Sequence, residues 1–398
     1  MSSERGLTAR IETSIHEIGR DDWDSCANPR TNAFVNSGNR GWLYPFLSYD
    51  FLEALESTKC ACAESGWLAQ HLALEDNTGQ VVAVMPCYLK SHSFGEYVFD
   101  HAWADAYERA GGRYYPKLQA AVPFTPISSP RILVRPGFDR MIAEEAITSA
   151  AIQLTDKLGV SSLHLTFVPK REWKGLATFG LLQRTSKQFH WPNLDYSSFE
   201  EFLAELTSRK RKAIRRERAR AIINDVDVNF VTGSDLTEAH WDAFYKFYED
   251  TCTRKWGQTY LNREFFSLIS ERMSDALLLI MAKRNGQYIA GALSFIGRDA
   301  LFGRYWGEIE HHDFLHFEIC FYQAIDFAIQ NRLKCVEAGA GGEHKLSRGY
   351  LPTTTYSAHY VAHPNLRQAI ADYLEEERHY IALEQSVLND HAPYRRTN

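Results

Sequence analysis

The sequence predicts a mixed α+β protein built from two similar halves, and a repeated pattern of strands carries this expectation. Residues 70–89 and 277–296 each contain an apolar strand, a glycine turn and a second apolar strand, with Gly79 and Gly286 about 207 residues apart. An Asn-Gly pair such as Asn285-Gly286 between strand patterns is a strong hairpin signal, because both residues tolerate positive φ. The irregular order of strands and helices favours an α+β unit over a regular βαβ array.

Helical patterns at comparable places support an internal duplication. A helix and an apolar strand follow each hairpin, and further helices precede the hairpins; the helices are expected at 48–57, 141–158, 236–251, 262–273 and 317–330, and the strands at 161–168 and 333–338. The spacing between the halves falls to about 173 residues here, so about 34 extra residues lie in the first half. The alternative is that hairpin, helix and strand follow one another twice by chance.

These patterns predict two domains. The first spans residues 1–190, with an insertion at about 91–130, and the second spans 191–388 and begins with a basic helix. The link between them is expected near 187–198, where Trp191-Pro192-Asn193 interrupts regular structure. The tail, 389–398, is expected to be loose.

Composition argues against a disordered, a membrane-spanning and a disulfide-rich protein. The chain has 398 residues, of which 45% are apolar and 24% charged, values typical of globular proteins. Its longest apolar run, Ala276–Ala282, is far shorter than the roughly 20 residues that cross a bilayer. Seven cysteines without a Cys-x-x-Cys pair indicate reduced thiols. We therefore expect a cytoplasmic protein, with peripheral membrane contact as the closest approach to a bilayer.

One segment is strongly basic although the whole chain has a net charge of −6. Residues 208–220 hold eight basic side chains against one acid, a density that suits phosphate groups of RNA, of a nucleotide or of lipid headgroups. The alternative is a solvated helix face matched by acids elsewhere.

Polar and aromatic residues gather in three further places. Residues 96–108 in the insertion combine Asp, His, Trp and Tyr, either as a functional segment or as a capped helix with an aromatic core face. Residues 303–307 place an arginine and two large rings between glycines, and 311–318 lead into a helix. Residues 337–352 end a strand in glycines and continue with Glu, His, Lys and Arg; the bland alternative is surface pairing of Glu343 with Lys345 or Arg348.

These segments resemble a known family. Gly342-Glu-His-Lys345 with Arg348-Gly-Tyr350 is similar to the glycine, lysine and aromatic signature near the end of Fem-like acyltransferases. Residues 90–100, 114–117, 122–126 and 303–307 extend the resemblance to the bacterial FemAB-like N-acyltransferases over nearly the whole chain.

The resemblance implies two tandem GNAT-type folds (the acyl-CoA N-acyltransferase fold). It also implies transfer of an acyl or aminoacyl group from an activated donor to an amine, in peptidoglycan-peptide or lipid metabolism of the cell envelope. No cofactor is then bound, because the donor, aminoacyl-tRNA or acyl-CoA, is a co-substrate. GNAT enzymes hold the CoA pyrophosphate on a glycine turn at a helix N-terminus, and no good copy of this turn precedes the expected helices at 141 or 317. A different class, a non-catalytic tRNA- or envelope-binding protein, is the remaining alternative.

Amine acylation needs a proton acceptor and donors for the carbonyl oxyanion. We expect Glu343 to be the base, with His344, Glu318 and His316 as alternatives. The substrates are expected to contact Asp100, His101, Trp103, Asp105, Tyr107, Arg304, Tyr305, Trp306, Lys345, Arg348 and Tyr350. Donor phosphate or tRNA is expected on Arg209, Lys210, Arg211, Lys212, Arg215 and Arg216. No metal is expected, because His312 and His316 share a helix face without a further ligand pattern.

Overall fold

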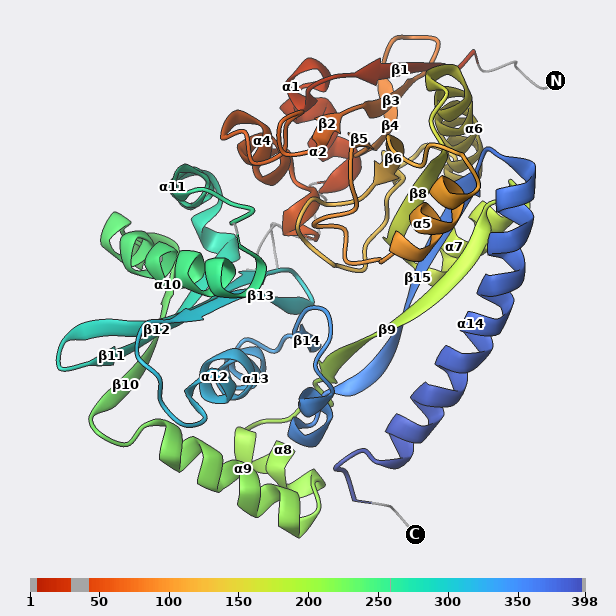
Figure 1. Cartoon of the computed structure of the whole chain (residues 1–398). Helices are drawn as coiled ribbons and strands as arrows, with labels where there is room; N and C mark the ends of the chain where they lie inside the picture. Colours follow the sequence, from red (N-terminus) through yellow and green to blue (C-terminus); the bar gives the residue numbers. More distant parts are fainter. Residues whose placement is uncertain (1–5, 30–42, 258, 396–398) are drawn as a thin grey trace. The chain divides into compact units, whose positions relative to one another are not determined.

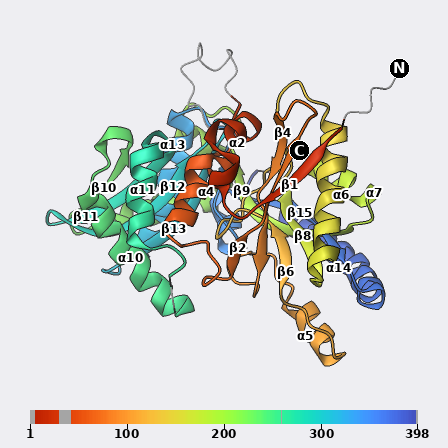
Figure 2. The same ribbon diagram turned by 90° about the horizontal axis from the view of Figure 1, so that it is seen from above.

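The computed structural model describes residues 6–29, 43–257 and 259–395, which form two compact units (Figures 1 and 2). Unit 1 contains residues 6–29, 46–186 and 354–383. Unit 2 contains 43–45, 187–353 apart from 258, and 384–395. Three long elements run from one unit into the other: β9 (Leu182–Pro192), β15 (Leu351–Val361) and α14 (Pro364–Asp390).

Unit 1 contains two sets of paired strands. One is an antiparallel sheet of order β1-β3-β4-β7, made by β1 (Thr8–Glu12), β3 (His71–Glu75), β4 (Val81–Met85) and β7 (Leu133–Val134). The other has the order β15-β8-β6-β5-β2 and contains β8 (Ser162–Val168), β6 (Lys117–Ala120), β5 (Tyr88–Lys90) and β2 (Trp67–Ala69). Within it β6 and β8 are parallel, while the pairs β5–β6 and β2–β5 are antiparallel.

Helices cover these strands. They are α1 (Ile15–Ile18), α2 (Arg20–Ala27), α4 (Tyr49–Ser57), α5 (His101–Arg109), α6 (Arg140–Leu158) and α7 (Lys170–Thr178), with a 3-10 turn at Pro45–Leu47. The Asp139 side chain caps the start of α6 by accepting from the amide of Met141, and Gly159 ends it with φ of 63°. Ala143, Ile147 and Ala151 of α6 then pack into the core of unit 1.

Unit 2 is built on one sheet of order β10-β11-β12-β13-β14-β9. Its strands are β10 (Val226–Thr232), β11 (Leu277–Arg284), β12 (Gln287–Ile296), β13 (Ala300–Glu308), β14 (Cys335–Glu337) and the second part of β9. Neighbours are antiparallel except β13 and β14, which run parallel. Asn285 and Gly286 both have positive φ and close the β11–β12 hairpin, as the sequence predicts.

Helices lie on both faces of this sheet (Figure 1). They are α8 (Phe199–Glu205), α9 (Ser208–Ala221), α10 (Glu238–Trp256), α11 (Arg263–Met273), α12 (Leu315–Phe317), a π-helical segment (Glu318–Tyr322) and α13 (Gln323–Gln330). Short 3-10 turns occur at Gly233–Asp235, Ser274–Ala276 and Glu343–Arg348. Alternate residues of β11 serve the two faces: Leu278 and Ile280 join the core cluster of α13, whereas Met281 lies opposite Gly291 near Phe244 of α10.

The structure differs from the sequence analysis in three places. The expected first hairpin forms, since β3 and β4 pair antiparallel, but Pro86 follows the end of β4 and the last residues of the expected second strand belong to β5 in the other set of strands. The expected link at 187–198 is strand up to Pro192, because β9 pairs with β14. Residues 354–383, expected in the second domain, belong to unit 1, since β15 pairs with β8 and α14 packs there through Ile370.

The tail is not loose over its described part. Leu206 bridges Tyr394, whose hydroxyl donates to the carbonyl of Gly349 at 2.7 Å. The rest of the expected tail, 396–398, lies outside the described residues. None of the described helices is long and apolar enough to span a bilayer.

Candidate active site

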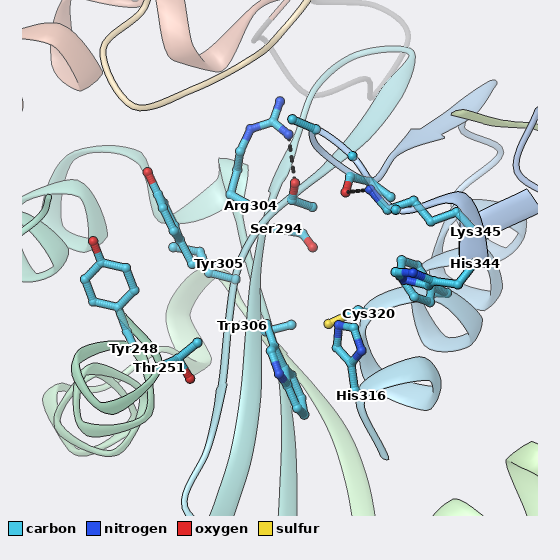
Figure 3. A pocket seen from close by; sticks show the side chains of 18 of the residues that line it. Tyr248, Thr251, Ser294, Arg304, Tyr305, Trp306, His316, Cys320, His344 and Lys345 are labelled. Atoms are coloured by element: carbon cyan, nitrogen blue, oxygen red, sulfur yellow. Dashed lines mark hydrogen bonds between the residues drawn. The ribbon is translucent and has the colours of Figure 1, made fainter. Parts of the chain in front are cut away.

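A cavity opens in unit 2 where two neighbouring strands separate. β13 and β14 pair in parallel as far as Phe302 and Glu337, where β14 ends, whereas β13 continues to Glu308. The cavity measures about 290 Å³ and is lined by α10, β12, β13, the π-helical segment and the chain after β14 (Figure 3). Its polar and aromatic wall is made by Tyr248, Thr251, Cys252, Ser294, Arg304, Tyr305, Trp306, His316, Cys320, Phe321, His344 and Lys345.

A bulge in β13 shapes one wall. Leu293 of β12 lies opposite Tyr305 while Ser294 lies opposite Gly303, so Arg304 is the extra residue. A bulge redirects side chains and bends the strand, and here it occurs where β13 leaves β14. The Arg304 guanidinium donates to the carbonyl of Gly303 at 2.7 Å. An arginine and two rings, Tyr305 and Trp306, thereby reach the cavity.

Lys345 forms the opposite wall. Gly339, Gly341 and Gly342 all have positive φ and turn the chain after β14. The Lys345 ammonium donates to the carbonyls of Ala338 at 2.7 Å and Gly339 at 3.1 Å. An ammonium carries three protons, so one donor remains for a ligand. Burial lowers the pKa of Lys345 to about 8, which still leaves it mostly cationic at neutral pH.

Two histidines lie next to each other on the helical side of the cavity. The rings of His316 and His344 are 6.3 Å apart, and His316 also lies 5.1 Å from the Trp306 ring (Figure 3). Burial, and then the charges of Arg348 and Lys345, lower the pKa of His344. His344 is therefore a neutral imidazole near pH 7, a form that can accept a proton.

A second hollow adjoins the first. It measures about 430 Å³ and shares Thr251, Trp306 and His316 with the first cavity. Its remaining wall consists of Arg254, Glu308, His311, His312, Asp313, Phe314 and Phe317. His316 and Trp306 consequently border both spaces.

A buried acid lies beside the first cavity, one residue before Ala338 of its wall. Burial raises the pKa of Glu337 to about 7, although the Arg304 charge opposes this. Among the described residues, Oε2 of Glu337 has no hydrogen-bond partner. His190 Nε2 lies 4.0 Å from it, and burial lowers the pKa of His190 to about 4.

Comparison with known proteins identifies the family. The model of a family described as peptidoglycan biosynthesis/recognition, FemAB-like, matches residues 14–396. The chain belongs to the FemAB-like family. No curated protein matches its sequence.

Solved structures share the fold of this FemAB-like chain. FemX matches with a TM-score of 0.53 at 12% identity, covering 92% of this chain and 100% of FemX. A conserved protein of unknown function from Bacteroides thetaiotaomicron matches with a TM-score of 0.50 at 12% identity, covering 88% and 99%. The mixed α+β fold with two tandem GNAT-like units, expected from the sequence, is confirmed.

The structure separates the four residues expected to act as base. His316 and His344 line the cavity, whereas Glu343 does not. The Glu343 side chain is 70% exposed and lies 3.8 Å from the Lys187 ammonium. Glu318 is buried on another side of its helix, where it accepts from the Arg218 guanidinium at 2.9 Å and from Gln323 at 2.7 Å. Neither acid is brought to the site.

Of the substrate contacts expected in the second half, some line the cavity and others do not. Arg304, Tyr305, Trp306 and Lys345 line the cavity. Arg348 lies over the Phe317 ring at 3.4 Å and donates to Glu217 at 2.9 Å, so it holds α9 against the 3-10 turn at 343–348. Tyr350 is fully buried and belongs to the core.

The expected contacts in the first half belong to unit 1. Asp100 is buried and accepts from the hydroxyls of Ser93 at 2.6 Å and Tyr114 at 2.7 Å, and from the buried Lys117 ammonium. Trp103 is a core residue of α5, and Tyr107 packs against His363. His101 and Asp105 are exposed on the same helix. The capped-helix alternative for residues 96–108 thus describes α5, although the Asp100 side chain makes no capping hydrogen bond.

The basic segment forms α9. Arg209, Lys212, Arg215 and Arg216 are exposed, and Lys210 and Arg211 are half-buried. Arg215 pairs with Glu200. In the described part of the chain the other five have no carboxylate within ion-pair distance.

The sequence analysis did not select Glu337, His190, Ser294, Cys320, Tyr248 or Thr251. The only local signal was a glutamate at the end of an apolar strand before a glycine turn, at Glu337. Among the described residues no cluster of His, Cys, Asp and Glu has the composition to hold a metal ion.

Proposed function

We propose that this protein is an N-acyltransferase of the cell envelope, which moves an acyl or aminoacyl group from an activated donor to an amine acceptor in the unit 2 cavities. The observation that carries the proposal is the convergence of Lys345, His316 and His344 at the point where β13 and β14 separate. Membership of a peptidoglycan-biosynthesis family supports the envelope as the place of action.

The donor acyl group would occupy the first cavity. Tyr305, Trp306 and Phe321 supply apolar surface for the acyl chain, and the Lys345 ammonium supplies charge to the carbonyl oxygen as it becomes an oxyanion. The two backbone carbonyls that already accept from Lys345 fix its position, so little reorganisation is needed when the charge develops.

The acceptor amine would approach from the second hollow. Its neutral nitrogen attacks the carbonyl carbon, a C–N bond forms, and the C–O or C–S bond to the leaving group breaks. His316 borders both spaces and would accept the proton that the amine loses; the leaving group then takes a proton in turn. The carboxylates of Glu308 and Asp313 in the second hollow would attract the acceptor in its ammonium form, which releases one proton to solvent before the neutral nitrogen attacks.

The segment that leads into α12 helps to decide between acyl-CoA and an aminoacyl ester as the donor. A pyrophosphate cradle needs several exposed backbone amides, commonly with glycines, at a helix N-terminus. Here the segment before α12 contains Glu308, Glu310 and Asp313 and no glycine, and α12 itself spans only three residues. The segment therefore offers no glycine-flanked cradle of backbone amides for pyrophosphate, which favours an aminoacyl ester over acyl-CoA.

The test is a transfer assay with both donors. Purified protein would be incubated with labelled aminoacyl-tRNA or labelled acyl-CoA and an amine-bearing envelope fraction, and product would be counted after mild alkali, which hydrolyses esters and thioesters but leaves amides. Alkali-stable label from either donor supports the proposal, and its source identifies the donor. Absence of stable label with both donors would overturn it and favour the non-catalytic binding protein.

A further inference from the structure

One face of α9 is strongly cationic. Arg209, Lys212 and Arg216 are three and four residues apart, so they follow one side of the helix, and all three are exposed. The described residues place no acid within ion-pair distance of these three cations. The whole chain carries a net charge of −6, so this face differs in sign from the average surface.

The opposite face holds the helix firmly to unit 2. Ile214 and Ala221 are buried, and the Arg218 guanidinium donates to Glu318 at 2.9 Å and to Asp326 at 2.7 Å. Figure 1 draws α9 along the edge of unit 2, with α12 and α13 on its inner side. The cationic face is therefore presented by a fixed helix and does not need to fold on contact.

An apolar tip follows the cationic face. Ile222 and Ile223 directly follow the end of α9, and each is 50% exposed. The next two residues, Asn224 and Asp225, both have positive φ, a tight reversal that leads directly into β10. These two adjacent isoleucines contribute little to the core, and beside the cationic face they suit a partner that has an anionic surface and an apolar interior.

We propose that this α9 surface, defined as Arg209, Lys212, Arg216, Ile222 and Ile223, docks onto a bilayer containing anionic phospholipid. Cations beside a membrane interact with the negative headgroups, and aliphatic side chains next to them insert below the headgroups. Asp225 carries an opposing charge, but three cations outnumber it. Because the net charge of the chain repels such a bilayer, contact depends on this local surface.

RNA is the competing partner for the cations. A phosphate backbone in solution binds Lys and Arg but gains no binding energy from exposed isoleucines. The Ile222-Ile223 tip therefore favours the bilayer, and it also separates the two partners experimentally. The inference does not depend on the proposed acyl transfer, since its test measures binding.

The experiment is cosedimentation of the full chain with vesicles. Vesicles of phosphatidylcholine with 30% phosphatidylglycerol would be compared with pure phosphatidylcholine, alongside filter binding of total tRNA. Three variants are needed: Arg209→Gln with Lys212→Gln and Arg216→Gln; Ile222→Ser with Ile223→Ser; and a matched control on exposed α7, Lys170→Gln with Arg171→Gln and Lys174→Gln.

We expect binding to phosphatidylglycerol vesicles that falls on the order of 100-fold in the α9 charge variant. We expect a fall of about tenfold in the isoleucine variant, and no such fall in the α7 control. Equal binding to both vesicle types, or loss in the α7 control equal to that in α9, would overturn the proposal. Retention of vesicle binding by the α9 variants, with tRNA binding lost only in the charge variant, would also overturn it and assign the surface to RNA.

Discussion

Lys345 is the residue on which the proposed chemistry depends most, because it is the ammonium fixed at the cavity wall. Replacing it with alanine removes the charge that would meet the oxyanion, and we expect kcat/KM for transfer to fall about 100-fold or more. The matched control is Lys334→Ala, since that lysine is 78% exposed and pairs with Asp299 at the surface. Equal rates for Lys345→Ala and the wild type would remove Lys345 from the mechanism.

His316 and His344 are both candidates for the proton acceptor, and they are distinguishable. His316 borders both hollows, whereas His344 lines the first alone. We expect His316→Gln to lower kcat by about 100-fold and His344→Gln to lower it by less than about tenfold. Steady-state rates of both variants decide this, and the reverse pattern would assign the base to His344.

The sequence predicted which segments form the site better than it predicted which side chains in them face the cavity. The segments 303–306 and 344–345 were selected from the clustering of charged and aromatic residues beside glycines. The sequence analysis preferred Glu343 to His344 as the base, but His344 is the one that lines the cavity. The positive φ angles of Gly341 and Gly342 set the direction of the chain here, and so decide which of the next side chains faces inward. Backbone dihedrals at glycine are not readable from sequence.

At the scale of elements, the contact between α10 and β13 sets the first cavity. A Cβ at Gly307 would lie 2.1 Å from the backbone carbonyl oxygen of Phe247, a distance that no side-chain movement relieves. We expect Gly307→Ala to lower the free energy of unfolding by about 3 kcal/mol or more, because the helix has to shift off the sheet.

The control lies in the same strand. A Cβ at Gly303 would meet its nearest atom, the Glu337 carbonyl oxygen, at 3.6 Å, which is ordinary contact. Gly303→Ala should therefore change stability by less than about 1 kcal/mol. Urea denaturation of both variants measures the difference, and similar midpoints would contradict the assigned packing.

Local signals explain which elements the sequence predicted. The β11–β12 hairpin and the helices α4, α6, α10 and α11 follow from turn residues, caps and apolar spacing within a few residues. The sequence did not predict that β9 is a strand through Trp191 or that β15 joins unit 1, because those assignments depend on pairing with residues far away along the chain.

At the scale of the whole molecule, stability should depend on pH through buried acids. Glu337 has an ordinary pKa of 4.5 when unfolded and about 7 when folded, as burial opposes its charge. Between these values the unfolded chain has released the proton and the folded chain retains it, so raising pH lowers the free energy of unfolding.

The variant Glu337→Gln isolates this contribution from other buried acids. We expect the loss of stability between pH 4.5 and pH 7 to be smaller in Glu337→Gln than in the wild type. Chemical denaturation at both pH values measures it. Identical pH dependence in the two proteins would show that Glu337 does not carry the shifted proton.

The duplication was readable from sequence because each half repeats the same hairpin, helix and strand. The division into units was less readable, since the chain returns to unit 1 after residue 353. Composition gave no sign of this return, which depends on the pairing of β15 and the packing of α14.

Trapping the donor in the first cavity tests directly whether the transfer takes place there. Bromoacetyl-aminoacyl-tRNA and bromoacetyl-CoA would be incubated with the protein, and alkylated residues mapped by mass spectrometry. Cys320 lines the cavity, so we predict labelling of Cys320 or its neighbours His316 and His344 by one reagent, prevented by the matching unreactive donor and reduced in Cys320→Ser. Labelling confined to residues outside the cavity, such as Cys62, and unaffected by that donor would show that the donor does not bind in this cavity.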